Sequence, residues 1–449
     1  MLQERIIKEL ELRKFGFEVF SLDCLGVAVF PDGRSFIYWN DPKLTAKEIS
    51  KISPKDETAY LRWAQFWSKA AGLLHYYFFR SAPSLRELSQ RARETDTEDI
   101  LEILLTWTLE DLLEEYFSDE NVKGALANYA QDLGDPSAVG SLLSAAYIHV
   151  QDLTSPENFG IVKGGMGGIT QSMERAAISI GVEILKGAEV ERIIVRENRV
   201  LGVRLSDNKE IDSPIVVSNA DPKRTFLRLL GEDSLPSGFK RKAEQLKTRV
   251  SYLKFHAALR ALPDFRRKYG NFDAKLLSNV WICPSIDHVR KSWDDAMHGR
   301  PSRSPIIHVQ IPTVVDPSMA PPGMHTMSMW VQYAPPRLNE GSWDDIRQAE
   351  GEFLIETLSH YAPNLSDVIS QWSLFTPLDL ERRVSLTDGN IRHLDMIPSQ
   401  MLSLRPSHKT PITGLYLCGA GTHPGGEVTG APGYNAAASV LSDYPSLKK

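Results

Sequence analysis

The residues most able to do chemistry form a glycine-rich stretch near the carboxyl end, LYLCGAGTHPGGEVTGAPGYNAAASVL. A short apolar strand over 415–418 leads into it, and an alanine-rich helix follows. Its six glycines fall within 15 residues: Gly419, Gly421, Gly425, Gly426, Gly430 and Gly433. A glycine-rich turn lets backbone N–H groups approach a ligand, and the start of the next helix attracts negative charge. The pattern predicts a cofactor loop, although tight turns and close packing alone would also need glycines.

A second glycine cluster, KGGMGGIT, lies directly before a predicted helix that begins at Ile169. It repeats the turn-to-helix pattern with Gly164, Gly165, Gly167 and Gly168. A strand through Ala188, Glu189 and Val190 follows, where it could lie against an adenine ring. The alternative is a helix that starts after a tight turn and contacts no ligand, which this cluster alone does not exclude.

Two histidines are candidate acid–base groups, because imidazole titrates near neutral pH. They are His393 in GNIRH and His423 in GTHPGG, and a structural role in holding a loop is the alternative for each. Arg382, Arg383 and Arg405 could hold an anionic group or form solvated surface pairs. No HExxH or GxSxG spacing and no Cys/His pair stands out, so we expect neither a metal site nor a hydrolase.

Hydrophobic periodicity predicts the elements that must position these groups. The first 150 residues are mainly helical, with helices expected over 57–79, 101–112, 121–130 and 138–150. A strand at 182–185 and an antiparallel meander of strands at 193–195, 200–205 and 215–217 are expected next. A second sheet is predicted from strands over 252–259, 306–311 and 325–333, with a helix over 343–361 after it.

Length and composition set the class of protein. The chain has 449 residues, of which 42% are hydrophobic and 24% charged, as in a large globular protein with room for two domains. The net charge of −6, without long runs of one sign, argues against a nucleic-acid partner. Three widely spaced cysteines favour a reducing compartment. Without an apolar leader or an 18-residue apolar run, we expect a cytoplasmic protein with no transmembrane segment.

Both glycine clusters, in this order and with the meander between them, resemble the phytoene desaturase-related FAD-dependent oxidoreductases. The likeness is carried by GGMGGITQSMERAA, GVEILKGAEVERIIVRENRVLGVRL, VVSNADP and the glycine-rich tail, and it spans essentially the whole chain. It implies an α+β fold of the α/β flavoprotein type, in which an FAD/NAD(P)-binding-like domain is interleaved with a helical and mixed-sheet substrate domain. The FAD-binding parts are expected at 155–225 and 370–449, and the substrate-domain parts at 1–154 and 226–369.

The resemblance also implies which residues contact FAD, position by position. Gly165 and Met166 match the loop that leads the first helix, and Glu189 and Val190 match the strand beside the adenine. The turn that passes the ribityl and phosphate groups is matched by Gly419, Ala420 and Gly421. The stretch whose backbone faces the pyrimidine edge of the flavin is matched by Glu427, Val428, Thr429, Gly430 and Ala431.

One departure from the family concerns its first segment. The family starts with a strand, a GxGxxG turn and a helix that hold the FAD pyrophosphate, and neither glycine cluster has that spacing. We therefore expect a dinucleotide-binding domain truncated at its amino terminus. A gene model that starts at an internal Met, a separate polypeptide and a true loss of the site are the three explanations. The first is favoured, because a cut at Met1 would expose a sheet edge.

The expected activity is hydride transfer at FAD from an apolar, isoprenoid-like substrate, as in a desaturase, dehydrogenase or isomerase. The alternative is a cofactor-free interaction protein or a non-catalytic subunit that has lost the pyrophosphate site. The expected partners are a small apolar substrate and an electron acceptor that the sequence does not identify. Peripheral membrane contact and homo-oligomers stay open.

Overall fold

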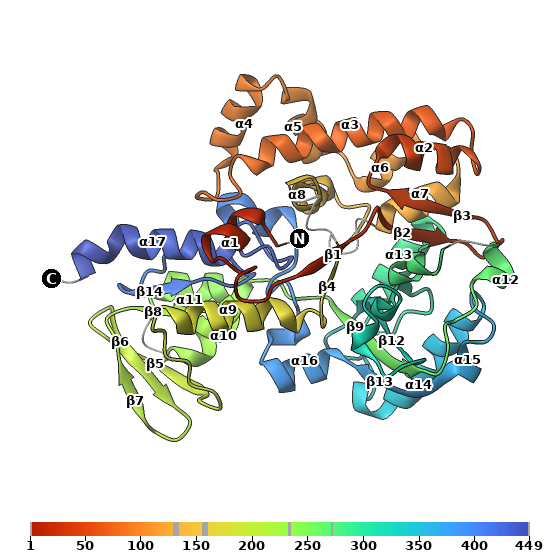
Figure 1. Ribbon diagram of the computed structural model, residues 1–449. Coiled ribbons are helices and arrows are strands. Elements are labelled where there is room, and N and C mark those ends of the chain that lie inside the picture. Colours follow the sequence, from red (N-terminus) through yellow and green to blue (C-terminus); the bar gives the residue numbers. More distant parts are fainter. Residues whose placement is uncertain (1, 129–133, 155–159, 232–234, 271–272, 448–449) are drawn as a thin grey trace.

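The computed structural model describes residues 2–128, 134–154, 160–231, 235–270 and 273–447 (Figure 1). Its largest sheet has seven strands, which are antiparallel to their neighbours except for the parallel pair of β10 and β2. In spatial order they are β13 (Ile369–Phe375), β9 (Ser251–Leu259), β12 (His325–Ala334), β11 (Ile306–Gln310), β10 (Val280–Ile282), β2 (Cys24–Val29) and β3 (Ser35–Trp39). The predicted second sheet is thereby confirmed through β9, β11 and β12.

One face of this sheet is apolar and packs against α14 (Trp343–Ser359) and α15 (Leu365–Val368). Phe255 and Met329 from the strands meet Trp343 and Leu354 from α14, and all four are buried. Fully burying a side chain of this size contributes about 1.5–3 kcal/mol. The helix predicted over 343–361 is confirmed, and it begins at a capping box between Ser342 and Asp345.

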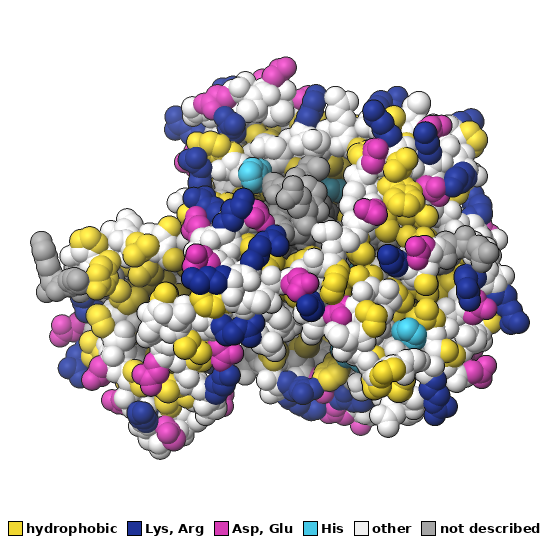
Figure 2. Space-filling view, viewed as in Figure 1, with side chains coloured by type: hydrophobic (Ala, Val, Ile, Leu, Met, Phe, Trp, Pro, Cys, Tyr) yellow, Lys and Arg dark blue, Asp and Glu magenta, His cyan; other side chains and the backbone are white. Residues whose placement is uncertain are grey.

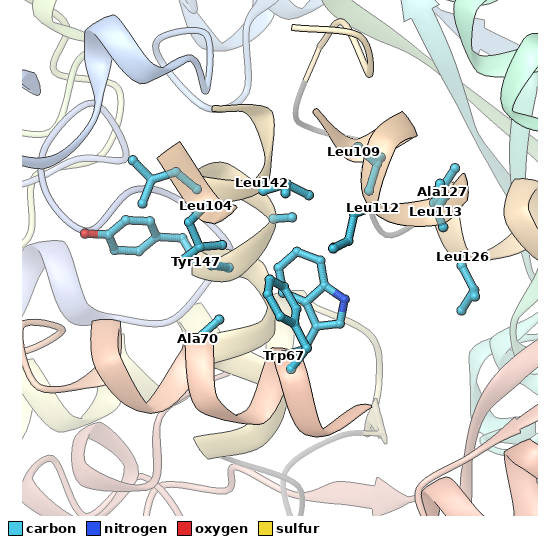
Figure 3. Close-up of a cluster of buried hydrophobic side chains, with 14 of the residues drawn as sticks. Trp67, Ala70, Leu104, Leu109, Leu112, Leu113, Leu126, Ala127, Leu142 and Tyr147 are labelled. Atoms are coloured by element: carbon cyan, nitrogen blue, oxygen red, sulfur yellow. The ribbon is translucent and has the colours of Figure 1, made fainter. Parts of the chain in front are cut away.

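A layer of helices lies on the other side of the sheet, over β2 and β3 (Figure 1). It consists of α2 (Pro42–Ser50), α3 (Asp56–His75), α4 (Leu85–Glu94), α5 (Glu98–Thr106), α6 (Leu109–Tyr116), α7 (Glu120–Ala127), α8 (Ser141–Thr154) and α13 (Ile286–Met297). Their apolar faces meet in one buried cluster, where Trp67 of α3 lies between side chains of α5, α6 and α8 (Figure 3). The mainly helical character predicted for the first 150 residues is confirmed over the described part of that stretch. The end of the helix predicted over 121–130 lies outside the described residues.

The single helix predicted over 101–112 is wrong, because two helices meet there. Trp107 has an extended backbone that ends α5. Thr108 then caps α6: its Oγ1 accepts a hydrogen bond from the Asp111 amide at 3.0 Å, and Asp111 Oδ2 accepts one from the Thr108 amide at 2.9 Å. This reciprocal cap stabilises the start of a second helix, although the apolar residues of the sequence continue through the break with helical spacing.

A second, smaller body contains a three-stranded meander of β5 (Val190–Arg196), β6 (Arg199–Leu205) and β7 (Glu210–Asp212). The predicted meander is confirmed for its first two strands, but its third is not 215–217. That segment belongs to β8 (Val216–Ser218), which pairs in parallel with β14 (Leu415–Leu417). The strand predicted at 182–185 is also wrong. No described strand lies beside it, and Val182, Ile184 and Leu185 are exposed.

Helices and one strand pair complete this body. They are α1 (Glu4–Glu9), α9 (Gly167–Ser179), α10 (Pro222–Arg224), α11 (Ser237–Gln245) and α17 (Ala431–Leu447), with β1 (Val19–Ser21) paired to β4 (Gly160–Val162). Ile6 and Ile7 of α1 pack in one buried cluster with Ile169 of α9. Two short helices lie nearer the large sheet, α12 (Arg266–Tyr269) and α16 (Pro377–Val384). Among the described residues no helix is both long and apolar enough to cross a bilayer.

Candidate cofactor groove

A groove of about 740 Å³ opens between α1, α9, α17 and the glycine-rich loop. Its volume falls in the range of roughly 300–1,000 Å³ that is typical of ligand pockets. The loop contributes 418–420, 425–426 and 428–430, and the first three turns of α17 contribute both small residues, such as Gly433 and Ala437, and the larger Tyr434 and Leu441. Glu9 is the one charged residue among the described lining residues. Hydrophobic side chains gather over α17 in this part of the surface (Figure 2).

The structure brings together most of the residues predicted from the carboxyl-terminal cluster. Five of them line the groove: Gly419, Ala420, Val428, Thr429 and Gly430. The other three, Gly421, Glu427 and Ala431, belong to the same loop but do not line the groove. A Cβ at Gly421 would collide with Pro222, and Ala431 is fully buried.

The four residues predicted on the adenine side lie outside this groove. The loop of Gly165 and Met166 is tied to the segment between β11 and β12, since the Gly164 amide donates to Asp316 Oδ2 at 2.7 Å. Glu189 is exposed and forms an ion pair with Arg224 at 3.6 Å. The strand predicted through 188–190 is wrong for its first two residues, because β5 begins only at Val190. From α9, it is Met173 that reaches the groove.

Three glycines show how the backbone shapes the groove. A Cβ at Gly419 would lie 2.9 Å from both the Asn219 carbonyl oxygen and His393 Cε1, so a side chain has no room there. Gly430 has a φ of +78° and packs against Ile6, so it also favours glycine. Gly433 is different, because no atom lies within 4 Å of its would-be Cβ. A side chain at 433 would therefore fill the groove.

Arg405 supports the loop from behind. Its guanidinium is buried and donates to four backbone carbonyls, those of Thr422, Gln400, Arg392 and Ala420, at 2.6–3.2 Å. Burial lowers the pKa of Arg405 to about 10, so the side chain stays charged at neutral pH. Because Ala420 lines the groove, Arg405 orients a groove wall; it is neither an exposed anion site nor a solvated surface pair.

A buried ion pair joins Glu427 to Arg392 behind the same loop. Glu427 and the next residue, Val428, both have positive φ, at +82° and +58°. The Glu427 carboxylate therefore pairs with Arg392, and Val428 is left half-exposed in the groove. For non-glycine residues this left-handed backbone costs about 1 kcal/mol or more each, so surrounding contacts must hold it.

The two candidate histidines differ in their partners. His423 Nε2 lies 2.9 Å from the Tyr77 carbonyl, its ring packs edge-on against Tyr147, and burial lowers its pKa to about 4. This histidine joins the loop to the end of α3. The ring of His393 lies against Gly419, and its buried Nδ1 has no hydrogen-bond partner among the described residues. Burial lowers the pKa of His393, with Asp221 opposing the shift.

Sequence reasoning missed two parts of this site. Ile6 and Glu9 of α1 and Leu10 directly after it line the groove, although they are more than 400 positions from the loop. No local pattern in the sequence marks that contact. Arg405 was named only as a candidate for anions or surface pairs. Its place in an apolar stretch, MLSLRP, is the one signal that could have indicated burial.

The groove fits the flavin end of FAD. A flat aromatic ring needs an apolar slot with backbone donors at its edge, and the loop, the start of α17 and the open space over Gly433 provide both. His393 Nδ1 is a further polar atom still unpartnered beside the loop. No lysine or arginine is among the described lining residues, so contacts to an anionic part of the cofactor from this lining would come from backbone amides.

Comparisons with known proteins agree with this reading. The protein is 29% identical to mouse pyridine nucleotide-disulfide oxidoreductase domain-containing protein 2, over all of this chain and 84% of the relative. It is 27% identical to the lycopene-forming phytoene desaturase of Pseudescherichia vulneris, over 91% of this chain and 80% of the relative, which confirms the resemblance inferred from the glycine clusters. The solved structure of cyclohexylamine oxidase from Brevibacterium oxydans superposes with a TM-score of 0.57 at 15% identity, covering 99% of this chain and 87% of that one, and shows the same fold.

The family assignment follows from the extent of the match. The sequence profile of the flavin-containing amine oxidoreductases matches residues 7–441, which is nearly the whole chain. The expected α+β flavoprotein fold, the FAD cofactor and the oxidoreductase class are all confirmed. This chain belongs to the flavin-containing amine oxidoreductase family and is an FAD-dependent oxidoreductase.

Proposed function

We propose that the protein transfers a hydride from an apolar, isoprenoid-like substrate to FAD, in a reaction of the desaturase, dehydrogenase or isomerase type. The observation that carries this proposal is the groove, whose walls are backbone and small or apolar side chains. Such walls exclude water and leave the redox chemistry to the cofactor. The relative named as a phytoene desaturase supports the same class of substrate.

When bound, FAD supplies a two-electron acceptor at its N5 atom. The residues of this chain then have three tasks. Arg405 holds the Thr422 and Ala420 carbonyls of the loop in place, so that the loop backbone would need no rearrangement to hold a flavin. The apolar side chains of α1 and α17 keep water out. His393 stays neutral at pH 7, because its pKa is lowered, and its Nδ1 can donate or accept one hydrogen bond to a ligand.

The proposal is tested by loading the protein with FAD, removing free FAD by gel filtration and titrating apolar candidate substrates under anaerobic conditions. We expect retained flavin absorbance that bleaches with substrate. In Gly433→Trp the indole fills the groove, so flavin uptake should fall while the fold persists. Gly238→Trp is the matched control, since Gly238 lies near the start of α11 and also has no atom within 4 Å of its would-be Cβ.

Two outcomes would contradict the proposal. If the wild-type protein retains no flavin, the alternative of a non-catalytic subunit is favoured. If flavin is retained but Gly433→Trp binds it as well as Gly238→Trp does, then the cofactor lies elsewhere.

A further inference from the structure

The seven-stranded sheet has a second face that differs from its apolar face. Strand register places Phe375, Lys254, Trp330, His308 and Trp281 side by side across β13, β9, β12, β11 and β10. Directly paired residues point to the same side of a sheet. We call this the polar sheet face and define it by six residues: Lys254, His256, His308, Ser328, Trp330 and Gln332.

Lys254 is the centre of this face. Its Nζ donates to Ser328 Oγ at 3.0 Å and lies 5.4 Å from the Trp330 ring centre. Among the described residues no carboxylate pairs with it. Burial lowers the pKa of Lys254 to about 8, and its charge helps to lower the pKa of His256 and His308. Lys254 is half-buried, and a partly desolvated cation without a counter-ion is costly to keep.

Neighbouring elements add to the positive charge and do not neutralise it. Arg383 of α16 lies 4.9 Å from the ring of Phe375, which is the β13 partner of Lys254. The carboxylates near β9 are already paired with other cations: Asp379 with Arg347, Glu381 with Arg337, and Asp388 with Lys223. The polar sheet face is therefore electropositive.

Gln332 provides an independent sign of a ligand. It is fully buried, and neither its Nε2 nor its Oε1 has a hydrogen-bond partner among the described residues. Residues 328, 330 and 332 alternate onto one side of β12, so Gln332 shares the face of Ser328 and Trp330. A buried side-chain amide without hydrogen-bond partners is destabilising. This cost favours a bound group that forms hydrogen bonds with the amide.

Strand β9 begins close to the segment that precedes the cofactor loop. Ser251, its first residue, points to the apolar face of the sheet and donates from Oγ to the Gly389 carbonyl at 2.7 Å. The segment after Gly389 carries His393, whose ring lies against Gly419 in the groove wall. Lys254 is three residues further along β9, about 10 Å from Ser251. Strand β9 therefore leads from the segment that carries His393 to Lys254.

We propose that the polar sheet face binds a carboxylate at the end of an otherwise apolar substrate, with Lys254 as its counter-ion. The inference rests on the proposed function for the identity of the bound molecule as the substrate. Lys254, Ser328 and Gln332 offer hydrogen-bond donors for the carboxylate, and the rings of Trp330 and Phe375 contact the apolar body. An ammonium group would be repelled by Lys254 and Arg383. The substrate class is thus an amphiphilic acid and not an amine.

The test compares decanoate, decanol and decylamine as probes of the whole protein without added FAD, by calorimetric titration at pH 7. We expect decanoate to bind about tenfold or more tightly than either other probe. This preference should vanish in Lys254→Met and persist in Lys254→Arg. Lys268→Met is the matched control, because Lys268 also lies over aromatic rings, those of Tyr269 and Tyr361, but away from this face.

A pH series on the wild-type protein gives the same test without a variant. Decanoate affinity should fall as Lys254 loses its proton above about pH 8, whereas decanol affinity should not. Equal binding of decylamine, or selectivity that survives Lys254→Met, would overturn the inference. If the protein selects the carboxylate but its bound flavin is not reduced by any substrate, the proposed function is overturned and the carboxylate site is not.

Discussion

The cofactor groove and the polar sheet face are built in opposite ways. The groove is shaped mainly by backbone, glycines and apolar side chains, and the polar residue that supports its wall, Arg405, does not line it. The sheet face is formed by large polar and aromatic side chains that lack partners of opposite charge. This difference implies that groove support stabilises the fold, whereas polar groups on the sheet face cost stability and serve a ligand.

The largest expected effect comes from Arg405→Met. Four buried carbonyls would lose their donor, and each unsatisfied group costs about 1–3 kcal/mol, so unfolding free energy should fall by about 4 kcal/mol or more. Urea denaturation measures the loss. Arg382→Met is the control, since Arg382 is exposed and its ion pair with Asp344 contributes about 0–1 kcal/mol. Similar losses in both variants would contradict a supporting role for Arg405.

Lys254→Met should change stability in the opposite direction. Burial lowers the pKa of Lys254 from 10.5 to about 8, so the unfolded chain binds more protons and stability rises with pH between these values. At pH 7 the variant should be more stable by up to about 3 kcal/mol, because it removes a partly desolvated charge. This advantage should shrink above pH 8 and vanish above about pH 10.5. A destabilised variant at pH 7 would show that Lys254 has a structural role.

Substitutions of His423 and His393 should change the free energy of unfolding by smaller amounts. His423→Ala should cost about 2 kcal/mol, because the Tyr77 carbonyl loses its partner and the contact with Tyr147 is lost. Burial lowers the pKa of His423 to about 4, so the contribution of its neutral ring is present above about pH 6.5 and lost as pH falls toward 4. His393→Ala should stay within about 1 kcal/mol of wild type while changing flavin binding. Thermal unfolding across pH distinguishes the two.

The smallest expected effect comes from Gly433→Ala. A methyl group at 433 meets no atom within 4 Å and improves helix propensity, so stability should rise by up to about 0.5–1 kcal/mol. Gly419→Ala is the contrasting variant, because its Cβ would collide with Asn219 and His393. Denaturation of both variants should give changes of opposite sign. Equal effects would mean that the groove wall is not rigid.

Local signals account for much of what could be predicted. The strands β9, β11 and β12 and the helix α14 follow from periodicity, because each has one face that must be buried. The break at Thr108 has a local signature too, the cap with Asp111, but the continuous apolar pattern conceals it. The misplaced segment at 215–217 had no such signature. Its parallel partner, 415–417, lies about 200 residues away, and a strand pair this distant leaves no local pattern.

The family, the cofactor and the glycine loop can be predicted from the residues alone, because they depend on short stretches whose backbone requirements are visible in residue type. The support of that loop by Arg405, the place of α1 in the groove wall, and the shared electropositive face of Lys254 and Gln332 become visible only in the folded chain. These facts depend on which distant strands pair and in which register. Register is set by the burial of a whole sheet, which no single segment encodes.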